Sequence, residues 1–172
     1  MYLQTPRLCI RDYQDEDWMD LLEILSDPVV MEKCEPVYDE IRTKEILHLF
    51  RSRNIGFAAV HRESEKVIGH ILFCQLPPPD PEGIFELGWF FNHHFWHQGY
   101  AYEASIHLLE YGFRELDLSA IRAETIDPDR AGRLLEKLGM RLEKILPGTV
   151  TDPAGRKADL YWYTIQNPKE ES

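Results

Sequence analysis

The chain has 172 residues, enough to bury a full hydrophobic core, and we expect one domain over residues 1–172. Its 44% apolar and 12% aromatic content excludes intrinsic disorder, and no apolar run approaches the roughly 18 residues of a membrane span. The formal net charge of −11 argues against nonspecific nucleic-acid binding, which needs a basic surface. An acidic surface fits a cationic substrate, and it equally fits simple solubility.

Cysteine usage and the first residues predict a cytoplasmic protein. The three cysteines, Cys9, Cys34 and Cys74, are odd in number, far apart and without metal-ligand spacing. We therefore expect reduced thiols that pack as small hydrophobic groups, and no bound metal. Residues 1–11 show no signal-peptide pattern, so we expect no export and no membrane partner.

The first half of the chain predicts a strand, two helices and a hairpin. Pro28 ends the first helix, because proline disfavours helix at the residue before it. Two apolar, alternating segments flank a polar turn, which is typical of a hairpin. Strands are expected at residues 7–12, 55–61 and 67–75, helices at 15–25 and 39–53, and irregular chain or a short helical turn at 29–36. The proline-rich residues 76–83 fit neither element.

Residues 85–116 read as a strand, a tight turn and an amphipathic helix. The strand FELGWFF is apolar and aromatic, and Asn92, His93 and His94 end it. The helix after Gly99 carries an apolar stripe at steps of three and four residues. A glycine ahead of a helix lets backbone N–H groups approach an anion, which the helix dipole also favours. Turn geometry alone explains the glycine equally well, so a phosphate site and a structural turn both stay open.

The last third predicts a strand, a helix and two final strands. The helix starts at Asp127-Pro128-Asp129 and ends at Gly139. Strands are expected at residues 120–126, 140–145 and 159–165, a turn-rich segment at 147–157 and a polar tail at 168–172. The order of elements predicts a mixed α/β (α+β) fold, with a mostly antiparallel twisted sheet of about seven strands flanked by about four helices. The central helix would connect two parallel strands.

Three separated strings are more specific than the glycine turn. Residues 5–30 (TPRLCIRDYQDEDWMDLLEILSDPVV) contain a T-x-R-L-x-I-R segment and a helix that ends in S-D-P. Residues 85–104 (FELGWFFNHHFWHQGYAYEA) end in a G-Y-A-x-E-A pattern, and residues 134–141 read LLEKLGMR. Together these strings resemble the GCN5-related N-acetyltransferase (GNAT) superfamily, in particular its ribosomal-protein N-terminal acetyltransferase branch. The resemblance spans residues 5–165.

The resemblance implies a binding site for acetyl-CoA, which would be the cosubstrate. In the family, backbone N–H groups of the turn before the central helix bind the pyrophosphate. The residues that match this turn are Trp96, His97, Gln98, Gly99, Tyr100 and Ala101. The preceding strand would offer free backbone groups to the pantetheine arm at Trp89, Phe90 and Phe91. A bulge amide in that strand would also stabilise the oxyanion that forms on the thioester.

The resemblance further implies direct attack by a primary amine, which needs a base to deprotonate the ammonium form. Glu86 lies where some relatives place a catalytic glutamate, and partial burial would raise its pKa as a base requires. A structural hydrogen bond to a neighbouring strand or loop is the alternative role. Glu103 is expected to be structural, because a carboxylate in the first turn complements the helix dipole.

The late helix departs from the family pattern. Pro128 and Ala131 stand where relatives of this branch often carry Asn and Ser, with Asp127, Asp129 or Arg130 as replacements if the loop is shorter. Leu135 stands where many members carry the Tyr that protonates the thiolate. We expect an N-acetyltransferase acting on a small-molecule or peptide amine, with a CoA-binding regulatory module of weak or lost catalysis as the alternative. No nucleic-acid partner is expected, and both monomer and homodimer stay open.

Overall fold

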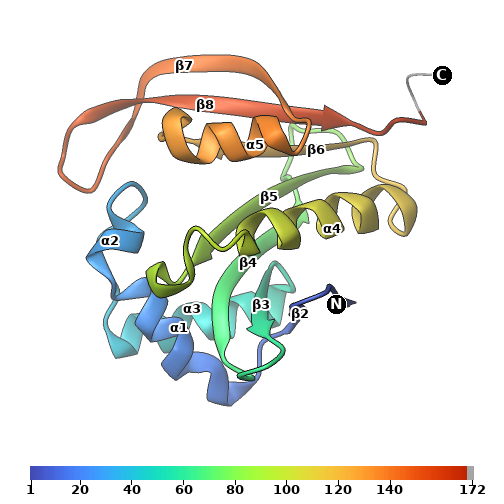
Figure 1. Cartoon of the computed structure of the whole chain (residues 1–172). Coiled ribbons are helices and arrows are strands. Elements are labelled where there is room, and N and C mark those ends of the chain that lie inside the picture. Colours follow the sequence, from blue (N-terminus) through green and yellow to red (C-terminus); the bar gives the residue numbers. More distant parts are fainter. Residues whose placement is uncertain (170–172) are drawn as a thin grey trace.

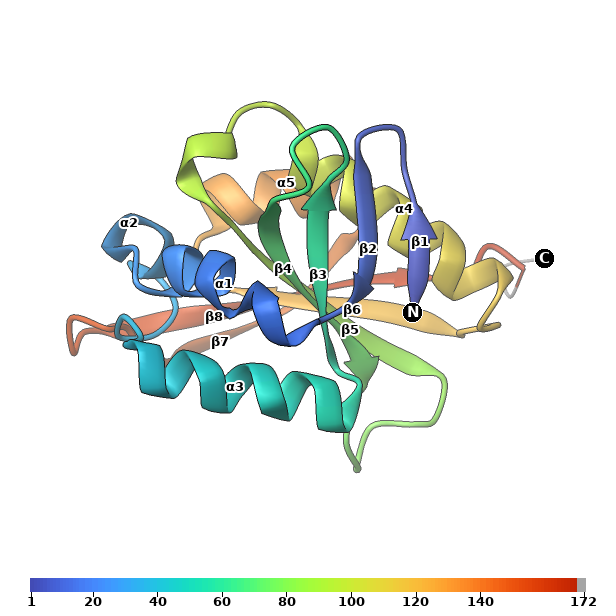
Figure 2. The same ribbon diagram turned by 90° about the horizontal axis from the view of Figure 1, so that it is seen from below.

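Eight strands form one sheet in the order β1-β2-β3-β4-β5-β6-β8-β7 (Figures 1 and 2) in the computed structural model, which describes residues 1–169. Every neighbouring pair is antiparallel except β5–β6, which is parallel. The strands are β1 Tyr2–Gln4, β2 Leu8–Asp12, β3 Gly56–His61, β4 Val67–Gln75, β5 Ile84–Phe91, β6 Ala120–Thr125, β7 Arg141–Thr151 and β8 Lys157–Gln166. The α-helices are α1 Trp18–Leu25, α2 Pro28–Met31, α3 Glu40–Arg53, α4 Tyr100–Arg114 and α5 Arg133–Lys137.

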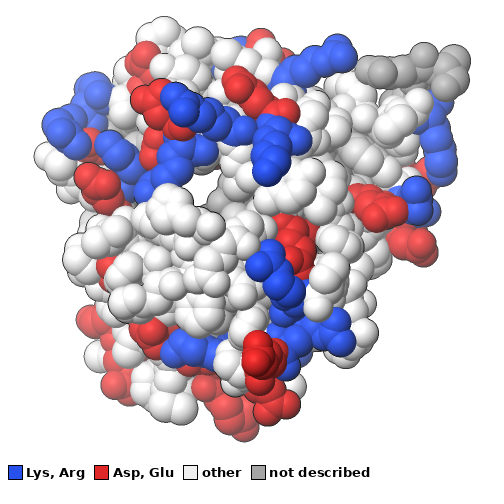
Figure 3. Space-filling view, viewed as in Figure 1, with Lys and Arg blue, Asp and Glu red and all other residues white. Residues whose placement is uncertain are grey.

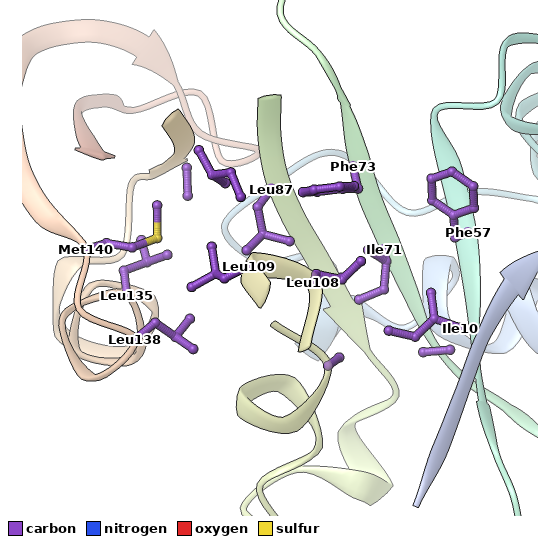
Figure 4. Close-up of a cluster of buried hydrophobic side chains, with 14 of the residues drawn as sticks. Ile10, Phe57, Ile71, Phe73, Leu87, Leu108, Leu109, Leu135, Leu138 and Met140 are labelled. Atoms are coloured by element: carbon purple, nitrogen blue, oxygen red, sulfur yellow. The ribbon is translucent and has the colours of Figure 1, made fainter. Parts of the chain in front are cut away.

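Two hydrophobic cores lie on the two faces of this sheet. On one face, Leu108 and Leu109 of α4 share a buried cluster with Leu87 of β5 and Leu135 of α5 (Figure 4). The stripe predicted after Gly99 is the buried side of α4. Helices α1 and α3 cover the opposite face with a second buried cluster (Figure 2). The prediction that the strands on either side of α4 run parallel is confirmed.

The predicted mixed α/β fold with a mostly antiparallel sheet is confirmed, with eight strands and five α-helices where about seven and about four were expected. Strand β1 has three residues and pairs with β2, Leu3 opposite Ile10, so it is too short to show a periodic pattern. Helix α2 has four residues and starts at the same Pro28 that ends α1. Proline suits the first position of a helix, and the Asp27 side chain caps it by accepting a hydrogen bond from Val29 N–H at 2.8 Å.

The last hairpin is longer than predicted. Residues 147–157 were expected to form a turn-rich segment, but β7 continues to Thr151 and β8 begins at Lys157. The register shifts between Leu142 and Lys144 and again between Leu146 and Val150, so that β7 passes Pro147 and Gly148 and resumes its pairing with β8 at Val150. In residues 1–169, no helix is long and apolar enough to cross a lipid bilayer.

Candidate active site

Strands β5 and β6 separate after a short parallel pairing. Their register runs only from Ile84 opposite Ala120 to Glu86 opposite Arg122. Beyond this point β5 continues to Phe91 along β4, whereas β6 continues to Thr125 along β8. The sheet therefore opens between β5 and β6, and one edge of β5 is free to bind a ligand through its backbone.

Trp89 directs its backbone N–H and C=O into this gap. Asn92 N–H donates to Ile68 C=O on the β4 side at 2.9 Å. Phe91 C=O points the other way and accepts the indole N–H of Trp96 at 2.7 Å. Because alternate residues of an antiparallel strand direct their backbone groups to opposite neighbours, Trp89 has the orientation of Phe91. Its amide is thus available to an extended ligand or a developing oxyanion.

The bulge that was expected in this strand is absent from the β4–β5 pair. Register is constant from Gln75 opposite Phe85 to Gly69 opposite Phe91. The open amide of Trp89 results from the separation of β5 and β6, so no extra residue in β5 is required.

The turn before α4 has the backbone geometry of an anion site. His97 and Gly99 both adopt left-handed conformations, with φ of 60° and 83°. Helix α4 begins its internal hydrogen bonding with Glu103 N–H to Gly99 C=O at 2.9 Å. The N–H groups of residues 100–102 precede that bond and have no intrahelical acceptor. Together with the positive end of the helix dipole, they favour a phosphate at this turn.

A cavity of about 810 Å³ connects this turn with the gap between β5 and β6. Its walls are mostly apolar and aromatic side chains of β5, β6, α4 and α5. Three cations, Lys33, Arg130 and Lys137, also line it. Figure 3 shows an opening on this face, with Lys and Arg side chains along its upper edge. An apolar channel with cations at its walls suits a ligand that joins a long neutral arm to phosphate groups.

The structure brings nearly all predicted site residues to this cavity. Those that line it are Glu86, Trp89, Phe90, Phe91, Trp96, His97, Gly99, Tyr100 and Ala101. Gln98 does not line it. Its backbone C=O instead accepts a hydrogen bond from Arg7 Nη1 at 2.9 Å, on the outside of the turn.

Glu86 and Glu124 flank the point where the strands separate. Glu86 lies opposite Arg122, and Glu124 follows two residues later on the same face of β6. Both glutamates line the large cavity and also a second cavity of about 300 Å³. The two glutamates are therefore shared by the linings of both cavities.

Burial and like charge set the acidity of this pair. Burial raises the pKa of Glu86, and the nearby Glu124 raises it further. Burial also raises the pKa of Glu124. The hydrogen bond proposed as the alternative role of Glu86 is not found among residues 1–169. Arg122 is already engaged by Asp80 and lies 3.6 Å from Glu143, measured from its Nε to Oε2.

Helix α5 and the turn before it offer an apolar wall and two cations, Lys137 and Arg130. A wide turn of π-helix at Pro128–Gly132 precedes it, with Asp127 accepting a hydrogen bond from Arg130 N–H at 3.2 Å. Of the possible replacements for the family's Asn and Ser, Asp127 and Arg130 line the large cavity and Asp129 does not. The Arg130 guanidinium carbon lies 4.7 Å from the ring centroid of Trp96. Leu135 lines the cavity and cannot donate a proton.

His93 and His94, which follow β5, lie in a short 3-10 turn and do not line the large cavity. His93 contacts Asp27, and its ring centroid lies 3.9 Å from that of His94. Within the described chain, no group of three or more His, Cys, Asp or Glu side chains is arranged to bind a metal ion. The three cysteines are free thiols there.

The sequence model of the acetyltransferase (GNAT) domain family matches residues 7–141. The chain belongs to the GNAT family. The uncharacterized N-acetyltransferase YnaD of Bacillus subtilis (strain 168) is 34% identical over 173 residues, which cover 96% of each chain. Among solved structures, a GNAT-family acetyltransferase from Bacillus anthracis is similar to this GNAT protein with a TM-score of 0.89 and 30% identity, covering 97% and 99% of the two chains.

Two more distant solved structures share the fold. Ribosomal-protein-S5-alanine acetyltransferase from Vibrio fischeri has a TM-score of 0.81 at 14% identity and covers 98% of this chain and 97% of its own. Spermidine N-acetyltransferase from Vibrio cholerae, in complex with CoA and spermine, has a TM-score of 0.81 at 18% identity and covers 96% and 99%. The resemblance to the GNAT superfamily is therefore confirmed, and its ribosomal-protein branch is among the structural neighbours.

Several residues at the site carried no readable signal in the sequence. Lys33 and Lys137 come from segments far apart in the chain, and only the folded structure shows that both line the cavity. Glu124 was detectable in principle, because it is a carboxylate within a predicted strand whose first residues, Ala120 and Ile121, are apolar. Its position at the gap follows from the parallel register of β6 and β5. The length of the strand alone does not specify this register.

Proposed function

We propose that this GNAT protein transfers the acetyl group of acetyl-CoA to a primary amine by direct attack. One observation carries the proposal: the left-handed turn before α4 opens into the cavity that reaches the gap between β5 and β6. The turn suits the pyrophosphate, and the free edge of β5 suits the amides of the pantetheine arm. The thioester would then lie at the gap, within reach of the Trp89 N–H.

Glu86 is proposed as the base. Its carboxylate would take a proton from the ammonium of the acceptor, and the free amine would attack the thioester carbon. The C–S bond then breaks, the products are an amide and CoA thiolate, and the second amine proton is lost to solvent. The Trp89 N–H would donate to the oxyanion that forms during the attack. Neither Leu135 nor Ala131 can protonate the thiolate, which is a tolerable leaving group near neutral pH.

The direct test combines binding and turnover. We expect calorimetry to show CoA and acetyl-CoA binding, and thiol release from acetyl-CoA to rise well above background with at least one amine. The panel should contain spermidine, spermine and peptides with free N-termini, because the neighbouring structures include enzymes named for such substrates. Absence of CoA binding at millimolar concentration would overturn the proposal.

A CoA-binding regulatory module is the second candidate. It is favoured by the late helix, where Pro128, Ala131 and Leu135 replace the expected polar groups. This candidate predicts CoA binding in calorimetry with no amine-dependent thiol release across the whole panel. Turnover with any amine, lost in a Glu86→Gln variant, would exclude it.

Glu124→Gln should shift the acid limb of the pH–rate profile to lower pH. Glu86 acts as a base only when ionised, so the rate falls as pH drops through its pKa. The charge of Glu124 raises that pKa, and its removal lowers it. The variant should therefore stay active at a lower pH than the wild type. Burial disfavours the ionised form of Glu124, so its replacement by a neutral amide should not lower the unfolding temperature. An acid limb that moves to higher pH would contradict the assignment.

A further inference from the structure

Glu103 is a buried carboxylate in the first turn of α4, with only 9% of the residue exposed. Its partners come from a segment 96 residues earlier in the chain. Oε1 accepts hydrogen bonds from Thr5 Oγ1 at 2.6 Å and from Arg7 N–H at 2.7 Å, and Oε2 accepts one from Arg7 Nε at 2.7 Å. Burial would raise the pKa of Glu103, but these hydrogen bonds lower it below its ordinary value. The carboxylate is therefore held as an anion in one orientation.

Arg7 extends this contact over the whole phosphate turn. Its Nη1 donates to Gln98 C=O at 2.9 Å, and its guanidinium carbon lies 4.2 Å from the ring centroid of Tyr100. A Cβ placed on Gly99 would lie 3.5 Å from Arg7 Nη2. One side chain thus contacts Gln98 and Tyr100 and lies close to Gly99 between them. Arg7 does not line the large cavity, so it supports the turn from behind.

The turn needs such support because its backbone is strained. A non-glycine residue in the left-handed region costs about 1–3 kcal/mol and persists only where its surroundings hold it. His97 is such a residue, with φ of 60°. An anion site of backbone N–H groups also loses affinity when these groups are displaced.

We propose that Glu103 and Arg7 are positioning residues that hold the turn at residues 97–100 in the conformation that binds the pyrophosphate. Glu103 fixes Arg7, and Arg7 fixes the carbonyl of Gln98 and the ring of Tyr100. The inference rests on the proposed use of acetyl-CoA. It assigns Glu103 a role beyond complementing the helix dipole, and it links the T-x-R string at the N-terminus to the G-Y-A-x-E-A string of α4.

The test is a Glu103→Gln variant with three measurements. CoA affinity by calorimetry should weaken about tenfold to a hundredfold. Affinity for pantetheine, which lacks the phosphates, should change by less than about twofold when followed through tryptophan fluorescence, because Trp89 and Trp96 line the cavity. Amide hydrogen exchange in a peptide covering residues 96–102 should accelerate in the ligand-free protein. A merely structural role for Glu103 would change stability and leave the ratio of the two affinities as it is.

Asp17→Asn is the matched control. Asp17 is also buried, at 8% exposed, and also pairs with an arginine, Arg11 Nη1 at 2.7 Å, but far from the turn in the chain. This variant should lower the unfolding temperature and keep the CoA affinity. Arg7→Lys is the second variant, because one ammonium cannot bond Glu103 and Gln98 as the planar guanidinium does. Arg7→Lys should also weaken CoA binding, and it tests the proposal if the Glu103→Gln variant does not fold.

The outcomes separate the two proposals. Wild-type protein that does not bind CoA overturns the proposed function. Wild-type protein that binds CoA, with unchanged affinity in both Glu103→Gln and Arg7→Lys, overturns only the positioning role. An equal loss of CoA and pantetheine affinity would also overturn it, because the pyrophosphate would then not be the group affected.

Discussion

Glu86→Gln should lower kcat for amine acetylation by about two to four orders of magnitude while leaving CoA affinity unchanged. The amide keeps the size of the side chain and cannot accept the ammonium proton. The phosphate turn belongs to α4 and is separate from β5, so the cofactor should bind as before. Steady-state kinetics and calorimetry on the same preparation test both parts.

The pH dependence makes this prediction specific. Wild-type activity should fall with decreasing pH through the raised pKa of Glu86, above the range of an exposed glutamate. The Gln variant should lose that limb, and its residual rate should follow the deprotonation of the amine itself.

Glu143→Gln is the control for Glu86→Gln, because Glu143 lies near Arg122 but lines neither of the two cavities described above. It should keep wild-type kcat. Equal losses in the two variants would show that Glu86 matters for structure and is not the base.

The local strings predicted the strand, the turn and the helix of the proposed cofactor site well. A strand, a glycine and an amphipathic helix are contiguous in sequence, so their order already places Gly99 at a helix N-terminus. The left-handed φ at Gly99 is the conformation that glycine adopts without steric cost. The family resemblance rested on the same contiguous segments, which is why the turn lies directly before α4 as it implied.

The remaining features depend on contacts between distant segments. The proximity of Glu86 to Glu124 requires the parallel register of β5 and β6, and Arg7 reaches Glu103 only after β2 and α4 pack together. The β7 register shifts at residues 146–150 likewise reflect pairing with β8, because Pro147 and Gly148 alone favour a turn. Side-chain patterns specify which elements form, whereas these contacts require the strand order and register.

Gly99→Val should abolish measurable CoA binding and leave the protein folded. At φ of 83° a β-branched side chain is strained, and a turn that leaves this conformation no longer directs its N–H groups at the phosphate. The left-handed conformation costs about 1–2 kcal/mol for a residue with a Cβ, less than the total stability of an ordinary domain. The space behind Gly99 is sufficient, since the nearest atom to a new Cβ is Arg7 Nη2 at 3.5 Å.

Gly139→Val separates backbone strain from loss of the phosphate site. Gly139 has a nearly identical φ of 86°, and a Cβ there would meet Ile165 Cδ1 at 3.6 Å, also an ordinary contact. It follows α5 and does not line the large cavity. Both variants should therefore lose similar stability in thermal unfolding, and only Gly99→Val should lose CoA binding in calorimetry. Wild-type CoA affinity in Gly99→Val would mean that the turn before α4 holds no phosphate, and the cofactor would have to bind elsewhere along the cavity.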